Sequence, residues 1–220
     1  MTIKNFVDLS LPLSNETPIY PGDPQPNIDV ATTVENEGYN LFGVFVGSQS
    51  GSHVDAPYHF ANEGNFVDKM NLDMFFGKGL KIVVPEKGAS EAITLADIEA
   101  ALPLIKERPF VLIQTGWNDK TIGTDDFLNN PYINREAAQA LVDAGTKFLG
   151  IDTINADSTG GEDFPVHDLF SSNNLMIGEN WAHFADLTAD EFYLSAFPLN
   201  MHTDGSPVRP VAIEVASSEQ

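Results

Sequence analysis

The most informative stretch of this sequence is Gln49-Ser50-Gly51-Ser52-His53-Val54-Asp55-Ala56-Pro57-Tyr58-His59-Phe60. Within eleven positions it holds two of the chain's five histidines, one carboxylate and one amide. Alternate side chains of an extended segment share a face, so His53 and Asp55 point the same way, with Cα atoms roughly 6.6 Å apart. Both side chains can then reach one metal ion, and the spacing predicts a metal site.

Two more residues of this stretch depend on how the chain bends. In a straight strand Gln49 shares the face of His53 but lies about 13 Å from it, too far to bind the same ion. Gly51 permits a bend that would bring Gln49 closer. Pro57 ends any regular strand and redirects His59. A free imidazole beside a metal cluster is what metal-assisted hydrolysis requires.

The composition is that of a globular chain. Its 220 residues, 42% of them hydrophobic, suit one domain over 1–220 with a full core. A net charge of −21 argues against nucleic acid and anionic membranes as partners. The absence of cysteine excludes disulfides, thiol catalysis and thiolate zinc sites. With no signal-peptide pattern and no membrane-length apolar window, we expect a soluble, cytoplasmic protein.

Hydrophobic patterning predicts more strands than helices. A helix is expected to start at Thr94, with Asp97 as its capping-box partner, and a second to run from Asn134 to Gly145. The first forty residues read as extended segments and loops. The partial alternation of the two element types predicts an α/β or α+β fold with a mixed sheet. The expected strands cover residues 41–46, 80–84, 110–114, 147–152, 175–178, 192–196 and 210–215.

A second candidate ligand cluster lies later in the chain. His167 stands in Pro165-Val166-His167-Asp168, and Glu179 follows the strand expected at 175–178. Site residues are common where a strand of an open α/β sheet ends. An imidazole and a carboxylate here would complete a site begun by His53 and Asp55.

With these residues in place, the chain resembles the cyclase family of metal-dependent hydrolases, which includes bacterial kynurenine formamidase and isatin hydrolase. The family signature is His-x-Gly-Thr-His-x-Asp-x-Pro-x-His, and residues 49–59 follow it except at Gln49 and Ser52. Further similarities follow in the family's order across nearly the whole chain: Tyr20-Pro21-Gly22-Asp23, Gln114-Thr115-Gly116-Trp117, Gly150-Ile151-Asp152-Thr153, Pro165-Val166-His167, Glu179-Asn180 and Gly205-Ser206-Pro207-Val208-Arg209.

The resemblance implies a swivelling β/β/α fold, a homodimer or homotetramer, and roles for single residues. His53 and Asp55 match metal ligands, with Asp55 bridging two ions in dinuclear members. His59 matches the catalytic imidazole. His167 and Glu179 match ligands of the second ion, and in mononuclear members the position of His167 acts in catalysis instead.

Two positions bear on the metal and the substrate. Gln49 replaces the first histidine ligand of the signature; its neutral, harder oxygen shifts the preference from zinc towards manganese or magnesium. Gln49 either binds the metal or forms hydrogen bonds beside it. The expected cofactor is a divalent metal, zinc or manganese, as one or two ions. Tyr20 falls near the position where kynurenine formamidases place an aromatic residue against the substrate.

These features predict a metal-dependent hydrolase of an amide, formamide, lactam or ester bond in a small molecule. An aryl formamide such as N-formylkynurenine is the first candidate substrate, and in that case the enzyme is an arylformamidase. One alternative is a polyketide-type cyclase or dehydratase that uses the same metal and His59. The other is a non-catalytic binding protein whose site decayed when the histidine at position 49 was lost.

Overall fold

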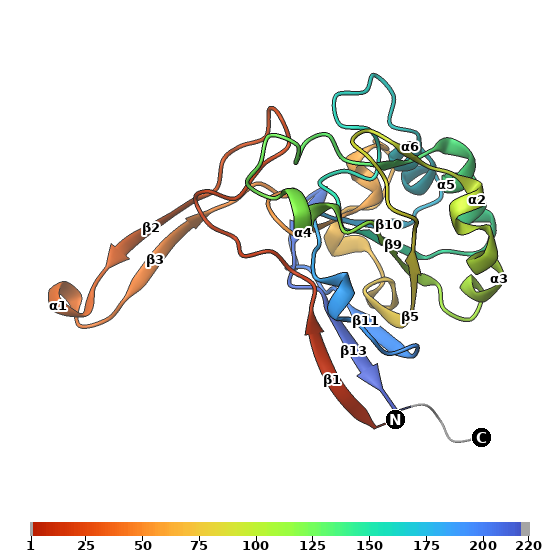
Figure 1. Cartoon of the computed structure of the whole chain (residues 1–220). Coiled ribbons are helices and arrows are strands. Elements are labelled where there is room, and N and C mark those ends of the chain that lie inside the picture. Colours follow the sequence, from red (N-terminus) through yellow and green to blue (C-terminus); the bar gives the residue numbers. More distant parts are fainter. Residues whose placement is uncertain (1, 217–220) are drawn as a thin grey trace.

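The computed structural model of the protein describes residues 2–216. A nine-stranded sheet forms its centre, in the order β1-β13-β11-β5-β7-β9-β10-β4-β12 (Figure 1). Its strands are β1 (Ile3–Asp8), β4 (His53–Asp55), β5 (Phe76–Val83), β7 (Phe110–Gln114), β9 (Phe148–Ile151), β10 (Met176–Glu179), β11 (Phe192–Ser195), β12 (Gly205–Pro207) and β13 (Val211–Val215).

The sheet is mixed. Strands β5, β7, β9 and β10 run parallel to their neighbours at the centre, whereas β11, β13 and β1 on one side and β4 and β12 on the other pair antiparallel. The expected α/β fold with a mixed sheet is therefore confirmed. Two small ladders complete the strands: β2 (Asn27–Thr32) with β3 (Leu41–Phe45), and β6 (Ala92–Ile93) with β8 (Tyr132–Ile133).

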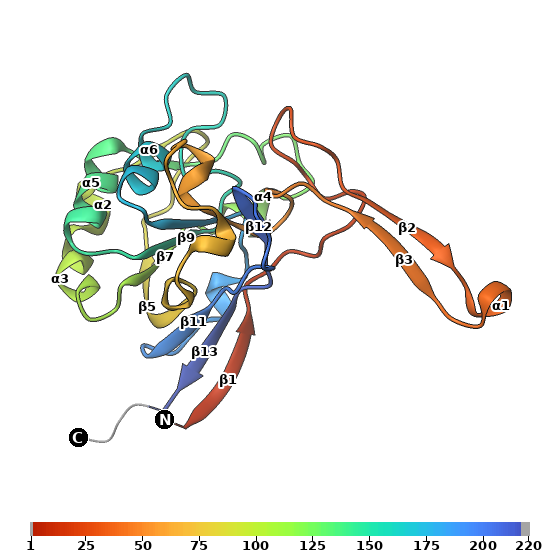
Figure 2. The same ribbon diagram turned by 180° about the vertical axis from the view of Figure 1, so that it is seen from behind.

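The larger helices lie on one side of the parallel strands in both ribbon views (Figures 1 and 2). Along β7, Val111 and Ile113 face these helices and join a core with Leu141 and Phe170. Phe110 and Leu112 enter a second core on the opposite face, as a strand covered on both sides requires. The helices are α1 (Val34–Glu37), α2 (Leu95–Ile98), α3 (Leu102–Ile105), α4 (Trp117–Thr121), α5 (Arg135–Asp143) and α6 (Pro165–Ser172).

The helix starts expected from the sequence are present. Thr94 and Asp97 form the predicted capping box before α2. Asn134 caps α5 by accepting a hydrogen bond from the Ala137 amide at 2.9 Å. Helix α6 is not among the helices expected from the sequence. Proline usually interrupts regular structure, but here Pro165 occupies the first position of the helix, where proline is favoured. Among residues 2–216, no helix combines the length and apolar character needed to cross a membrane.

Strand β4 is shorter than a straight extended segment from Gln49 to Asp55 would be. Only His53–Asp55 is a strand, and Gly51 adopts a left-handed conformation with φ of 64°. This is the bend that glycine permits, and residues 48–52 form turns. Strand β4 is short because its two neighbours, β10 and β12, each pair with it over only three residues.

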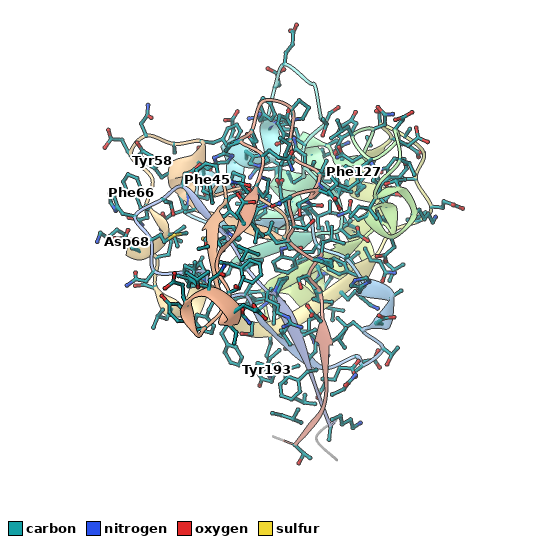
Figure 3. The ribbon with its side chains drawn as sticks, turned by 90° about the vertical axis from the view of Figure 1, so that its left-hand side faces the viewer. Phe45, Tyr58, Phe66, Asp68, Phe127 and Tyr193 are labelled. Carbon is teal, nitrogen blue, oxygen red and sulfur yellow. The ribbon has the colours of Figure 1, made fainter. Side chains whose placement is uncertain are left out.

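The β2–β3 hairpin projects from the body as an arm, with α1 at its tip (Figures 1 and 2). Figure 3 views the molecule from the side of this arm, with Phe45 labelled at the end of β3. Most arm residues are exposed, including Phe42 and Val44. The arm leads directly into residues 46–52 and so into β4.

Gly178 leaves room for the Trp181 side chain, which is hydrogen-bonded to the backbone of the candidate ligand His53. The indole Nε1 of Trp181 donates to the His53 carbonyl oxygen at 3.0 Å, and the ring lies against Gly178 with no room for a Cβ atom. We expect Gly178→Ala to displace Trp181 and to lower the free energy of unfolding by about 1–3 kcal/mol, as overpacking does. Urea denaturation measures this change.

Gly43→Ala is the matched control, because a Cβ atom at Gly43 in the exposed arm would have no neighbour within 4 Å. Equal denaturation midpoints for the two variants would show that Trp181 is not held in this way.

Candidate metal centre

Three of the predicted ligands are brought together by the short strand β4. The pairing of β4 with β10 places Glu179 opposite His53, and Ile177 opposite Asp55. All three polar side chains are buried, with exposures of 3 to 5%. Their ligand atoms lie within 4.8 Å of one another.

The fourth predicted ligand, His167, reaches the cluster from α6. The amides of Val166 and His167 lie in the first turn of the helix and have no acceptor within it, and Asp157 accepts from both, at 2.9 and 3.1 Å. The same carboxylate accepts from His167 Nδ1 at 2.7 Å. The Nε2 atom therefore points the other way, towards Asp55 and Glu179.

Each imidazole faces one oxygen of each carboxylate. His53 Nε2 lies 3.4 Å from Asp55 Oδ1 and 3.6 Å from Glu179 Oε2. His167 Nε2 lies 3.5 Å from Asp55 Oδ2 and 3.3 Å from Glu179 Oε1. Ligands about 2.0–2.1 Å from a tetrahedral ion are separated by roughly 3.3 Å, so these distances suit metal ligation.

Hydrogen bonding at the far side of each ring supports the same conclusion. His53 Nδ1 donates to the Gly51 carbonyl oxygen at 2.8 Å, as His167 Nδ1 does to Asp157. In a neutral imidazole this leaves the Nε2 lone pair free to ligate. Both oxygens of Asp55 are buried without a hydrogen-bond partner among residues 2–216. A buried, unpartnered carboxylate facing two ring nitrogens fits a divalent cation.

In the absence of a cation, protons on the two imidazoles balance the negative charge of the Asp55 and Glu179 carboxylates. Burial opposes the charged form of His53, but the Asp55 and Glu179 carboxylates outweigh it and raise its pKa to about 10. Burial is likewise outweighed at His167, whose pKa is raised by Glu179 and Asp157. The imidazoles in turn lower the pKa of Asp55 despite its burial.

His59 lies next to the cluster, as the sequence predicts. Pro57 starts a single 3-10 turn, Pro57–His59, one residue after the end of β4. The ring of His59 is 5.9 Å from that of His167 between centroids, and its Nδ1 donates to Asp204 Oδ2 at 2.8 Å. The hydrogen bond from His59 lowers the pKa of Asp204 to about 2, which keeps this carboxylate ionised at neutral pH.

Gln49 reaches the same cavity through the bend at Gly51. Its Nε2 donates to Asp204 Oδ2 at 3.1 Å, while its Oε1 is buried with no hydrogen-bond partner in the described chain. The amide packs on Gly205, where an added Cβ would lie 2.6 Å from the Gln49 nitrogen. Since an ionised carboxylate only accepts hydrogen bonds, the amide nitrogen is the atom that faces Asp204, and the oxygen is left without a partner among residues 2–216.

The cavity over the cluster has a volume of about 210 Å³. His53, His59 and Glu179 line one part of it, and Tyr20 lies on its wall. Phe60 adds an aromatic surface. Six of the seven predicted site residues line this cavity, and the seventh, Asp55, lies beneath it against His53 and His167.

Sequence reasoning missed two carboxylates that orient these residues. Asp204-Gly205 by itself is typical of a turn, and the only signal for Asp204 is that it directly precedes the Gly205–Arg209 segment that follows the family pattern. Asp157 offered no local signal, since its role depends on the position of α6.

Metal binding should release protons. Because His53 and His167 have raised pKa values in the metal-free protein, protons compete with the metal until the pH approaches about 10. Affinity for Mn²⁺ or Zn²⁺ is therefore expected to increase as the pH rises from about 6 to about 9. Calorimetry of chelator-treated protein, in buffers with different ionisation enthalpies, counts the protons. A binding heat that is independent of the buffer would contradict this account of the cluster.

Comparison with known proteins identifies the family of this chain. The family described as "Putative cyclase" matches residues 7–158. The kynurenine formamidase of Bacillus thuringiensis (strain Al Hakam) is 28% identical over 215 residues, which cover 96% of this chain and 98% of the relative. That of Geobacillus thermodenitrificans (strain NG80-2) is 27% identical over 209 residues, covering 93% and 95%.

Solved structures share the fold. An isatin hydrolase bound to the product analogue thioisatinate matches with a TM-score of 0.82 at 23% identity, covering 94% of this chain and 91% of the other. Isatin hydrolase A from Labrenzia aggregata, bound to benzyl benzoate, has a TM-score of 0.83 at 23% identity, with 96% and 93% covered. These matches confirm the expected cyclase-like fold. This chain belongs to the putative cyclase family of metal-dependent hydrolases.

Proposed function

We propose that this protein hydrolyses a carbon–nitrogen bond, other than a peptide bond, in a small aryl amide. An aryl formamide such as N-formylkynurenine is the first candidate substrate. The observation that carries the proposal is the buried Asp55 carboxylate, which has no hydrogen-bond partner among residues 2–216 and lies between two imidazoles that line the same cavity as His59. The relatives named kynurenine formamidase support the choice of bond.

The walls of the cavity support an aromatic substrate. Phe60 and Phe164 pack with ring centroids 5.3 Å apart, and Tyr20 also lines the cavity. Aromatic rings favour offset or edge-on contacts with one another, so a planar aryl group suits these walls.

The proposed chemistry divides between the cluster and His59. His53, Asp55, His167 and Glu179 would hold one or two divalent ions, manganese or zinc, and bound metal polarises the scissile carbonyl and acidifies water. His59 would accept a proton from the attacking water and pass it to the leaving nitrogen. Its Nδ1 is engaged with Asp204, so its Nε2 is the atom available for this transfer.

Replacing His59 tests this assignment. We expect His59→Ala to lower kcat by about 10²- to 10⁴-fold, because proton transfer is lost, while bound metal is retained. Hydrolysis of N-formylkynurenine, isatin and simple aryl esters by the metal-loaded enzyme gives the rates, and elemental analysis gives the metal content.

His202→Ala is the matched control, since His202 stacks on Phe66 and pairs with Asp68 on the surface. Unchanged turnover in His59→Ala would remove His59 from the mechanism. Metal-loaded enzyme that hydrolyses none of these compounds would instead favour a cyclase, dehydratase or binding role.

We also propose that the chain forms a homodimer or homotetramer through the β2–β3 arm. Cross-strand pairs Ile28–Val44 and Val30–Phe42 make one face of the arm apolar, and Val30, Phe42 and Val44 are each more than half exposed. An isolated two-stranded hairpin is marginally stable in water, so this face needs a covering surface. Residues 27–45 contain no Lys or Arg, which disfavours nucleic acid or an anionic membrane as that surface.

Polar substitutions on the arm test this assembly. Light scattering after gel filtration is expected to show an oligomer for the native chain and a monomer for the double variant Phe42→Ser with Val44→Ser. Asp29→Ser, which changes the opposite face beside Gly43, should leave the oligomer intact. A native chain that is monomeric at all concentrations would disprove the assembly.

A further inference from the structure

We infer that Asp204 is a positioning residue, which holds the His59 imidazole with its proton on Nδ1 and its Nε2 lone pair free for proton transfer. The inference rests on the proposed function, because it assigns the atom of His59 that acts there. It gives Asp204 a role in the site and assigns the tautomer of His59.

The first support is the geometry of the pair. His59 Nδ1 lies 2.8 Å from Asp204 Oδ2, a short distance for a nitrogen and a carboxylate oxygen. An ionised carboxylate only accepts hydrogen bonds, so Nδ1 must carry the proton. The other tautomer would place a nitrogen lone pair against a carboxylate oxygen.

The second support is the way the carboxylate itself is held. Ser48 Oγ donates to Asp204 Oδ1 at 2.7 Å, and Gln49 Nε2 donates to Oδ2 at 3.1 Å. Both oxygens are thus engaged, and rotation of the carboxylate would break at least one of these bonds. The Gln49 nitrogen is also 3.2 Å from His59 Nδ1, but two donors cannot bond to each other, so it acts on Asp204.

The third support is the backbone. Asp204 directly precedes β12, whose first residue, Gly205, pairs with the candidate ligand Asp55 on β4. The Ala56 amide donates to the Asp204 carbonyl oxygen at 2.8 Å, and the turn that carries His59 begins at the next residue. One ladder therefore sets the positions of the ligand strand, the imidazole and the carboxylate that orients it.

If Asp204 only stabilised the fold, its replacement would mainly lower the free energy of unfolding. The His59 and Asp204 side chains are 28% and 32% exposed, and ion pairs open to solvent contribute little to stability. Removal of the carboxylate should therefore leave the fold nearly unchanged. Its main effect should fall on the orientation and tautomer of His59.

The decisive variant is Asp204→Asn, which is similar in shape but can donate a hydrogen bond to Nδ1 and so favour the opposite tautomer. In the zinc-loaded enzyme we expect kcat to fall by about 10²-fold or more, with KM and metal content little changed, because a wrong tautomer impairs proton transfer rather than binding. Asp204→Glu, which keeps the carboxylate, should recover part of the loss.

Nitrogen-15 spectra of the histidine rings give a readout that does not depend on turnover. The His59 signals, assigned by their absence in His59→Gln, should show a protonated Nδ1 in the native enzyme and a protonated Nε2 in Asp204→Asn. Asp68→Asn is the matched control, because Asp68 accepts from His202 Nδ1 at 3.0 Å on the surface. It should change neither kcat nor the His59 signals.

The inference is overturned if Asp204→Asn keeps native kcat, or if the His59 tautomer is the same in both proteins. If the native enzyme hydrolyses none of the substrates, the proposed function fails, but the spectra still decide whether Asp204 sets the tautomer. Should Asp204→Asn fold poorly, Ser48→Ala removes one anchor of the carboxylate. A smaller loss of kcat with unchanged KM would then support the inference, and native kcat would overturn it.

Discussion

The site depends on one electrostatic constraint, the burial of the Asp55 carboxylate without a hydrogen-bond partner in the described chain. A buried charge is destabilising by several kcal/mol unless a compensating charge lies close to it. Here the neighbours are the Nε2 atoms of His53 and His167, and both rings have committed Nδ1 to an acceptor on the far side. Either protons or a cation must therefore occupy the space between these groups. A divalent ion is the occupant that matches the ligand types, the distances and the family to which the chain belongs.

The pairing of the short strand β4 with β10 and β12 brings the ligands of this cluster together and also positions the rest of the site. Strand β4 has only three residues, yet it lies between β10, which carries Glu179, and β12, which follows Asp204. The Pro57 turn then puts His59 on the cavity wall. The cluster and the proposed proton carrier are thus parts of one backbone arrangement. Gln49 belongs to the same arrangement, because its Nε2 donates to Asp204 Oδ2 at 3.1 Å.

The arm and the site are continuous in the chain. Strand β3 ends at Phe45, and the turns that carry Ser48 and Gln49 follow at once. A surface that covers the apolar face of the arm would therefore also restrain the segment that anchors Asp204. This continuity gives a physical reason to study assembly and activity together.

Local pattern in the sequence was enough for the mixed α/β fold, the strand at 110–114 and the helix caps at Thr94 and Asn134, because strand alternation and capping involve residues close together in the chain. The spacing of His53 and Asp55 is likewise a local property, whereas the roles of His167 and Glu179 came from the family resemblance. Helix α6 and the roles of Asp157 and Asp204 required the tertiary structure. A carboxylate that orients a histidine 10 or 145 positions away leaves no local signal, because only the pairing of distant strands and the packing of α6 bring the two together.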